Sequence, residues 1–343
     1  MKLAELHYSP EQIAYAMRKE RLGGKCLISI CGAGETLAQD EVIDIVALLL
    51  HEGHFVNITS NGTLTKKYER LVHACSDNIE NLHVSFSFHY LELVKRNLLD
   101  SFFSNIRMVK NAGASILLQI NLCDDYVPYW DEIKKISIKQ LGAPPQVALT
   151  RNERVKPFRI ETTLSSEEYY RIGQQFDSPL FRFTFKNFNI KRNEFCYAGD
   201  WSGVLNLATG MLNKCYANTE SAQNIFEDPD KPINFEAIGH NCKNSYCVNS
   251  SHFMSLGIIP EIQTPSYAEL RNRKEASWYN KNAEMFLGSK LNESNQEYGL
   301  IKKTILSLKT RMLHISRAKG VRGKLAEFKF YQLLHRIKVK VKN

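Results

Sequence analysis

The chain has 343 residues, of which 43% are hydrophobic, an ordinary share for a protein with a packed core. No stretch reaches the roughly 18 apolar residues that a membrane-spanning helix needs, and no apolar run follows Met1. We therefore predict a cytoplasmic protein with no transmembrane segment. In that compartment the eight cysteines should remain free or bind metal rather than form disulfides.

The net charge of +9 is concentrated at one end of the chain. Residues 301–343 hold 13 Lys or Arg and one Glu, a net charge of +12, which leaves −3 for residues 1–300. Nucleic-acid binding is therefore the least supported of the functions we consider, because the body of the chain is slightly acidic. Hydrophobic residues from Ile305 to Ile315 have helical spacing. This tail is predicted to be a basic helix that docks on the protein or contacts an anionic surface, and its removal is expected to leave a metal site intact.

Helix-like and strand-like segments alternate through the first 150 residues. Ser9 is the predicted N-cap of the first helix, which continues to about Leu22 and ends at Gly23-Gly24. The predicted strands are 26–30, 55–58, 82–88, 116–122 and 146–150, and the helices between them are 40–51, 64–74, 98–111 and 129–141. Parallel βαβ units follow from this alternation, and a doubly wound sheet and a partial or full (β/α) barrel both fit it.

The second half of the chain has a looser pattern. A helix is predicted at 165–176, and residues 181–260 then contain short segments, turns and four cysteines. We interpret this segment as a small domain whose limited core is stabilised by metal.

Two polar loops follow predicted strands. The first is Cys31-Gly32-Ala33-Gly34-Glu35-Thr36, in which glycines allow close approach of a ligand and the carboxylate can hold an ammonium group. The second contains Asn61-Gly62, a common turn sequence. Each loop alone is weak evidence, because tight turns after strands are frequent.

The order of these motifs, followed by Val84-Ser85-Phe86-Ser87 on the next strand, resembles the barrel of radical S-adenosylmethionine (SAM) enzymes. In that family the first loop binds the amino group of SAM, and polar residues on later strands meet its ribose and carboxylate. The resemblance therefore implies SAM contacts for Gly34, Glu35, Asn61, Gly62, Ser85 and Ser87. Ala33 and Thr36 depart from the family's common Gly-Gly-Glu-Pro form.

The chain also departs from the family at the catalytic cluster. Radical SAM enzymes hold a 4Fe-4S cluster on a Cys-x-x-x-Cys-x-x-Cys loop after the first strand, and this sequence has no such triplet. Cys26, Cys31, Cys75 and Cys123 are expected to be buried free thiols. Because the first strand and the cluster loop are missing together, we expect an incomplete start rather than gradual decay, with a natural truncation as the alternative. SAM binding by the chain as given should be weak.

The strongest metal signal lies downstream. Cys196-x13-Gly210-x4-Cys215 is followed by Asn224-Ile225 and by Cys242-x4-Cys247. Four cysteines match the ligand count of one iron-sulfur cluster or one structural zinc.

This segment resembles a SPASM domain, which opens with the same cysteine-glycine-cysteine spacing. The usual later cysteine array is reduced here to Cys242 and Cys247, so the resemblance implies one auxiliary 4Fe-4S cluster held by Cys196, Cys215, Cys242 and Cys247. The expected fold is an α/β chain with a partial (β/α) TIM-like barrel of radical SAM type, a small cysteine-rich domain and a basic helical tail. Its expected divisions are residues 1–180, 181–262 and 263–343.

The resemblance implies an enzyme, or an N-terminally incomplete form of one, that generates a 5'-deoxyadenosyl radical. Its substrate would be a peptide, a sugar or a small molecule, and its electron donor a flavodoxin or ferredoxin. The alternative is a non-catalytic scaffold with iron-sulfur or zinc. No catalytic residue is assigned. Weaker candidates for the cavity or the metal are His89, Tyr90, Asp124, Asp125 and His252, although each also has an ordinary structural explanation.

Overall fold

The computed structural model describes residues 5–32, 34–155, 157–216, 222–240, 242, 244, 247 and 250–318, with side chains of the last helix described to residue 309. The helices of the first part are α1 Pro10–Ala16, α2 Lys19–Leu22, α3 Asp40–His51, α4 Thr65–Ala74, α5 Tyr90–Lys95, α6 Leu99–Asn111 and α7 Trp130–Leu141. Those that follow are α8 Ser166–Gln174, α9 Pro179–Asn187, α10 Tyr267–Arg271, α11 Lys281–Gly288, α12 Leu291–Ser294 and α13 Leu300–Ala318. The strands are β1 Leu27–Ile30, β2 Phe55–Ser60, β3 Leu82–Ser87, β4 Ser115–Leu122, β5 Gln146–Leu149, β6 Arg151–Asn152, β7 Arg159–Ile160, β8 Val204–Leu205, β9 Met211–Asn213 and β10 Gln223–Asn224.

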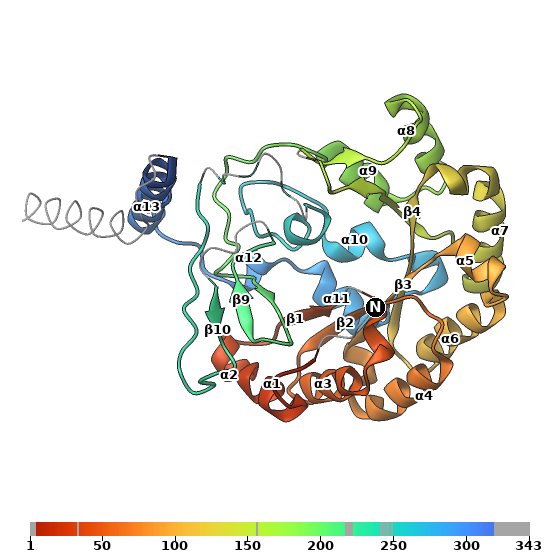
Figure 1. The fold of residues 1–343 in the computed structure, drawn as a ribbon, viewed down its shortest axis with the longest axis horizontal. Coiled ribbons are helices and arrows are strands. Elements are labelled where there is room, and N and C mark those ends of the chain that lie inside the picture. The colour runs from red at the N-terminus through yellow and green to blue at the C-terminus, as the bar shows by residue number, and fades with distance from the viewer. Residues whose placement is uncertain are drawn as a thin grey trace, which may run out of the picture.

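The main sheet has five parallel strands in the order β1-β2-β3-β4-β5 (Figure 1). Parallel crossovers are right-handed, so an order that never reverses puts every crossover helix on the same face of the sheet. Figure 1 shows α3, α4, α6 and α7 along that outer face. The other face is the concave interior of a partial (β/α) barrel, which confirms the expected fold and excludes the doubly wound sheet.

The strand register produces an unusually polar barrel interior. Ser29 of β1 lies beside Asn57 of β2, and Asn57 lies beside His83 of β3. In the next layers Ser85 pairs with Leu117, and Ser87 pairs with Gln119. Because side chains alternate between faces along a strand, the intervening Ile58, Val84 and Phe86 face the outer helices, where they are buried.

The first predicted helix is interrupted. Ser9 caps α1 as predicted, in a reciprocal pair with Gln12, but α1 ends at Ala16 and α2 begins at Lys19. The carbonyl of Met17 lies 2.8 Å from Nε2 of His54, and Arg18 has an extended backbone. The buried histidine thus takes a carbonyl that a continuous helix would have used.

The segment from α10 to α11 packs against the amino ends of the barrel strands, where Asn280 contacts Ser115 at the start of β4. Trp278 and Tyr279 are buried in the same core as the sheet, and the carbonyl of Trp278 accepts a hydrogen bond from Ile116 N at 2.9 Å. Buried residues between 267 and 287, the first part of the extension predicted at 263–343, therefore belong to the main core. Helix α9 packs on β5 and spans the boundary predicted at residue 180.

A second hydrophobic core lies around the cysteine-rich segment. Its most buried members are Phe195, Tyr197, Ala198 and Ile258, and Leu306 of α13 packs into it. The adjacent strands form an antiparallel sheet in the order β10-β9-β8. Most of the basic tail, residues 319–343, lies outside the described residues.

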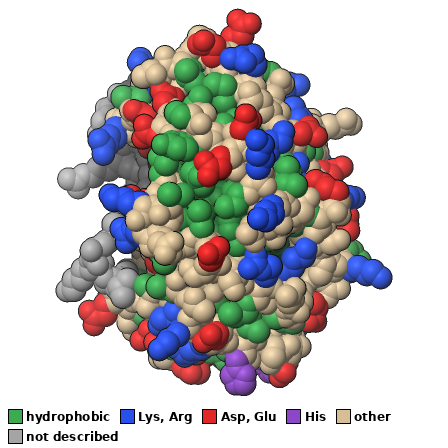
Figure 2. Space-filling view, turned by 90° about the vertical axis from the view of Figure 1, so that its right-hand side faces the viewer, with side chains coloured by type: hydrophobic (Ala, Val, Ile, Leu, Met, Phe, Trp, Pro, Cys, Tyr) green, Lys and Arg blue, Asp and Glu red, His purple; other side chains and the backbone are tan. Residues whose placement is uncertain are grey.

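The outer face that carries α5, α6 and α7 has a mixed surface. Figure 2 shows basic and acidic side chains interspersed among hydrophobic ones, without a field of one sign. Among the described helices, none combines the length and apolarity needed to cross a membrane.

Candidate functional site

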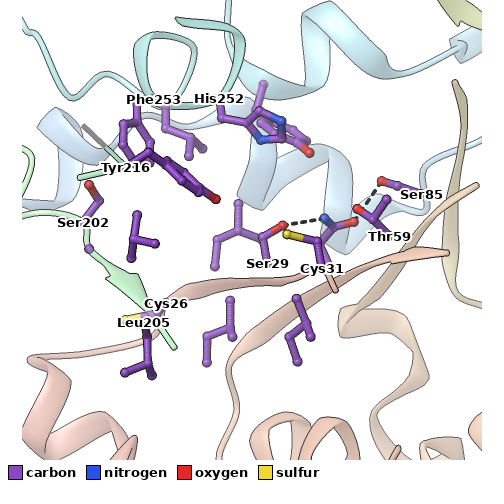
Figure 3. A pocket seen from close by; sticks show the side chains of 18 of the residues that line it. Cys26, Ser29, Cys31, Thr59, Ser85, Ser202, Leu205, Tyr216, His252 and Phe253 are labelled. Carbon is purple, nitrogen blue, oxygen red and sulfur yellow. Dashed lines mark hydrogen bonds between the residues drawn. The ribbon is translucent and has the colours of Figure 1, made fainter. Parts of the chain in front are cut away.

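A cavity of about 2410 Å³ lies between the barrel interior and the segments of the second core (Figure 3). Ser29, Thr59 and Ser85 form its barrel wall, and Ser202 and His252 face them from the other side. Pockets for single small ligands measure about 300–1,000 Å³. The cavity is therefore large enough for two ligands side by side.

Asn57 is the centre of the polar barrel wall. Its Nδ2 donates to Ser29 Oγ at 2.7 Å, and its Oδ1 accepts from Ser85 Oγ at 3.0 Å. The same oxygen lies 2.7 Å from His83 Nδ1. Burial lowers the pKa of His83 to about 3, with a further contribution from Arg271, so the ring is neutral. Its proton is on Nδ1, because Asn57 Oδ1 can only accept.

Glu35 is held by the protein itself. One carboxylate oxygen accepts from Ser60 Oγ at 2.6 Å and from Leu37 N at 3.0 Å, and the other accepts from Asn61 N at 2.8 Å. Gly34 and Glu35 both line the cavity. The carboxylate nevertheless has a structural role already, since it connects the loop after β1 to the end of β2.

Asn61 and Gly62, predicted to contact SAM, shape a turn outside the cavity lining. Asn61 Oδ1 accepts from the backbone and hydroxyl of Thr63. Gly62 has a positive φ of 78°, and a Cβ there would collide with the ring of Phe102. Ser85 and Ser87, by contrast, line the cavity. The structure thus brings Gly34, Glu35, Ser85 and Ser87 to one cavity.

Most weaker candidates lie elsewhere. His89 is exposed and Tyr90 is buried, and the cavity lining includes neither. Asp124 accepts hydrogen bonds from Thr162 and Thr163, which lower its pKa; Asp125, beside it in the same turn, also lies outside the lining. His252 does line the cavity, and burial lowers its pKa to about 3.

The four downstream cysteines lie around the second core. Cys196, Cys215, Cys242 and Cys247 are all partly buried against it. Burial raises the pKa of Cys196, and the other three thiols raise it further, which places them near one another. Among the described residues, no group of three or more His, Cys, Asp or Glu has the spacing of a metal site. The fold therefore gathers the thiols without arranging them around a common point.

The cysteine cluster adjoins the cavity. Tyr216, which follows Cys215, and Asn244, which lies between Cys242 and Cys247, both line it. Ser202, six residues after Cys196, lines it too. A group bound by these thiols would therefore lie at the cavity wall.

The other cysteines are free thiols, as predicted, but not all are buried. Cys75 is buried, whereas Cys26 and Cys123 are partly exposed. Cys31 is exposed, which contradicts our prediction. Cys31 is exposed because it follows the end of β1, where the chain leaves the sheet. It lines the cavity, as does Cys26, which precedes β1 (Figure 3).

No protein-family model matches the sequence, and no curated protein matches it either. Among solved structures, Streptococcus suis SuiB bound to S-adenosylmethionine is similar, with 14% identity over 66% of this chain and a TM-score of 0.48. The match covers 58% of that chain, less than two thirds of its length. Native anSMEcpe with bound AdoMet and Kp18Cys peptide matches over 65% of this chain and 70% of that chain, with 14% identity and a TM-score of 0.43. A histidine-tagged form of anSMEcpe with bound AdoMet matches over 92% of this chain and 88% of that chain, with 13% identity and a TM-score of 0.43.

Proposed function

We propose that the chain is a radical SAM-type protein whose barrel cavity receives SAM and a substrate and whose second core holds one auxiliary iron-sulfur cluster. The main supporting observation is the position of Cys196, Cys215, Cys242 and Cys247, which lie around one core beside the cavity. The proposed substrate is a peptide, a sugar or another small molecule, the proposed electron donor is a flavodoxin or ferredoxin, and the proposed location is the cytoplasm.

The cavity's own groups suit a polar ligand. Ser29, Asn57 and Ser85 form a hydrogen-bonded row on the barrel wall that offers hydroxyl and amide groups. Such groups can pair with the hydroxyls of a ribose. The volume of about 2410 Å³ leaves space for a second molecule beside it.

Four thiolate ligands can hold either one iron-sulfur cluster or one zinc ion. The partly buried position of the four cysteines satisfies the need for a shielded site. A cluster bound there would supply electron relay or a substrate contact at the cavity wall. The protein would bring together thiols from separate parts of the sequence, namely Cys196, Cys215, Cys242 and Cys247.

Anaerobic reconstitution with iron and sulfide tests the metal site. We expect about four iron and four sulfide per chain, and a sharp loss of iron in Cys196→Ser and Cys247→Ser. Cys75→Ser is the matched control, because Cys75 is a buried thiol outside the second core. Iron content that stays unchanged in both ligand variants would contradict the site, and a colourless protein with one tight zinc would contradict iron.

A non-catalytic binding protein is the second candidate, and Glu35 favours it. Its carboxylate already accepts three hydrogen bonds from Ser60, Leu37 and Asn61, so it is not free to receive an ammonium group without rearrangement. The absence of the cysteine triplet also removes the iron that would chelate SAM. We therefore expect weak SAM binding by this chain in equilibrium dialysis. Reductive cleavage of SAM by the reconstituted chain with dithionite would rule this candidate out.

A further inference from the structure

Arg271, at the end of α10, is a buried cation in the wall of the cavity. Its side chain lines the cavity although the residue is 1% exposed. The guanidinium lies 3.9 Å from the ring centre of Tyr267, and Nη2 donates to the carbonyl of Ser251 at 2.8 Å. Nη1 is buried and has no hydrogen-bond partner in the described part of the chain.

No acidic side chain among the described residues forms an ion pair with Arg271. A buried charge without a counter-ion is costly, because it loses its hydration and gains no attraction in return. Arg151, another cation of the cavity wall, differs in this respect because Glu153 pairs with it at 2.9 Å.

The groups around Arg271 do not neutralise it. Burial lowers the pKa values of His83 and His252 to about 3, and Arg271 contributes to both shifts. Both rings are therefore neutral near physiological pH. Burial raises the pKa of Tyr279, so its hydroxyl is also neutral. Tyr279 Oη and His83 Nε2 are buried without partners among the described residues, and their rings lie 4.8 Å apart.

Arg273, two residues further on, shows how a structural arginine is satisfied in this fold. It is also buried, but it donates to the carbonyls of Pro144, Pro145, Phe176 and Asp177. These bonds fix the start of β5 against α9 and account for its burial. Arg271 has only one such bond within the described part of the chain, and this difference between two neighbouring buried arginines calls for an anionic partner.

We propose that Arg271 is the recognition residue for a carboxylate of the ligand that occupies the cavity. A guanidinium matches the planar geometry of a carboxylate with parallel N–H donors. The neutral hydroxyl of Tyr279 can donate to the same oxygen, or connect to it through a water. This inference rests on the proposed function only in treating the cavity as the substrate chamber, and it selects acids over neutral sugars.

The test uses the full chain without added iron or SAM. N-acetylglycine is the carboxylate probe, N-acetylglycinamide is its uncharged match, and inorganic phosphate is a competing oxyanion, all at equal ionic strength. Binding is measured by calorimetry and by the shift of the thermal unfolding midpoint. We expect N-acetylglycine to bind and raise the midpoint, and the amide to do neither. Phosphate binding in preference to the carboxylate would overturn the assignment.

Arg271→Met should weaken N-acetylglycine binding about tenfold or more while leaving the ligand-free midpoint unchanged or higher, since it removes an uncompensated buried charge. Arg271→Lys keeps the positive charge but loses the pair of parallel N–H donors, so it should also weaken N-acetylglycine binding. This variant tests the proposal if the Met variant does not fold. Lys25→Met is the control, because Lys25 is another cation of the cavity wall. Equal loss in Lys25→Met, or retained binding in Arg271→Lys, would overturn the proposal.

Cys196→Ser separates this inference from the proposed function. The variant should lose iron in reconstitution and still bind N-acetylglycine as wild type does. Carboxylate binding without an iron site would leave the Arg271 inference standing alone. An iron site without carboxylate binding would refute the Arg271 inference and leave the proposed function intact.

Discussion

The carboxylate of Glu35 accepts a hydrogen bond from the hydroxyl of Ser60 at 2.6 Å. Through this bond, and a second from Asn61 N at 2.8 Å, the loop after β1 is attached to the end of β2. Ser60 is buried, and its hydroxyl also lies 2.5 Å from Oη of Tyr68. Glu35 therefore stabilises the edge of the cavity before any ligand binds.

Glu35→Gln should lower the free energy of unfolding by about 1.5–3 kcal/mol, because one acceptor oxygen becomes a donor that faces other donors. Urea unfolding measures the change. Glu69→Gln, at an exposed position of α4, is the matched control and should shift stability by no more than about 0.5 kcal/mol. Equal stability of both variants would mean that Glu35 is available to a ligand.

Gly62→Ala tests whether Gly62 acts through the backbone rather than through SAM. Its φ is 78°, and a Cβ would collide with the ring of Phe102. We expect the free energy of unfolding, measured with urea, to fall by at least about 2 kcal/mol, because the added methyl overpacks the site and the left-handed backbone disfavours alanine. Gly288→Ala is the control, since nothing lies within 4 Å of its Cβ position. A Gly62→Ala protein of normal stability would contradict the structural role.

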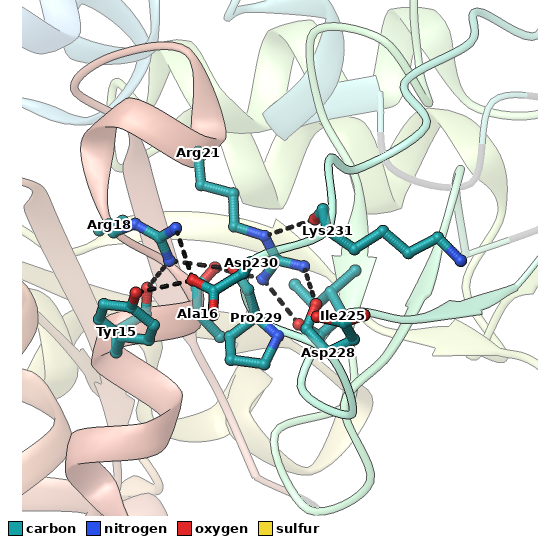
Figure 4. A network of polar contacts seen from close by, with 9 residues as sticks. All are labelled: Tyr15, Ala16, Arg18, Arg21, Ile225, Asp228, Pro229, Asp230 and Lys231. Carbon is teal, nitrogen blue, oxygen red and sulfur yellow. Dashed lines mark hydrogen bonds and ion pairs between the residues drawn. The ribbon is translucent and has the colours of Figure 1, made fainter.

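Arg21 joins the N-terminal helices to the segment after β10. Figure 4 shows its guanidinium among backbone carbonyls of both parts. It donates to Ala16 at 2.8 Å, Ile225 at 2.7 Å, Asp228 at 3.0 Å and Lys231 at 3.1 Å. A lysine has one donor group and cannot reach this set of acceptors.

Arg21→Lys should therefore cost about 1.5–3 kcal/mol in urea unfolding and increase proteolytic cleavage near residues 225–231. Arg96→Lys is the control, because Arg96 pairs with Glu92 at the surface with 69% of its side chain exposed. Its expected cost is below about 0.5 kcal/mol. If the two substitutions have the same effect, Arg21 does not hold the two parts together.

The elements of the barrel could be predicted because their signals are local. Helix α3 has the predicted bounds Asp40–His51, and all five predicted strands are present in the sheet. Apolar periodicity, caps and glycines determine such elements within a few residues. The cysteine spacing was equally visible, because it depends only on sequence.

Asn57, His83 and Arg271 were missed because their roles depend on register and on distant packing. Asn57 and His83 meet only because β2 and β3 pair in one particular register. A polar residue at every second position of β2 and β3 was the available signal. Arg271 reaches the cavity because α10, far along the chain, packs beside the start of β5, which no local pattern predicts. Cys31 is exposed because it lies where the chain leaves β1.

His83 should make stability depend on pH. Its folded pKa is about 3, below the ordinary histidine value of 6.5, so the unfolded chain binds a proton that the folded chain excludes. The stability that the neutral His83 ring contributes is fully present above about pH 6.5. It is lost as the pH falls toward 3, at up to about 1.4 kcal/mol per pH unit. His83→Gln should reduce the slope of unfolding free energy against pH by that amount between about pH 4 and 6. An unchanged slope would show that His83 is protonated in the folded protein.

The final prediction concerns where the basic tail can be cut. We expected removal of residues 301–343 to leave the metal site intact, but Leu306 is buried in the second core and Lys309 pairs with Glu236 at 2.9 Å. The cut should therefore be made after Ala318. Residues 319–343 still hold eight Lys or Arg and one Glu.

A chain ending at Ala318 should keep the unfolding midpoint and the iron content of the full chain, and lose salt-sensitive binding to phosphatidylserine vesicles. A chain ending at Gly299 should also lose vesicle binding, and its free energy of unfolding should be lower by about 1.5–3 kcal/mol, because the second core then lacks the side chain of Leu306. Vesicle sedimentation at low and high salt measures the first effect, and urea unfolding measures the second. If the chain ending at Ala318 also loses iron, the tail belongs to the folded core; if it still binds vesicles, the tail is not the anionic contact.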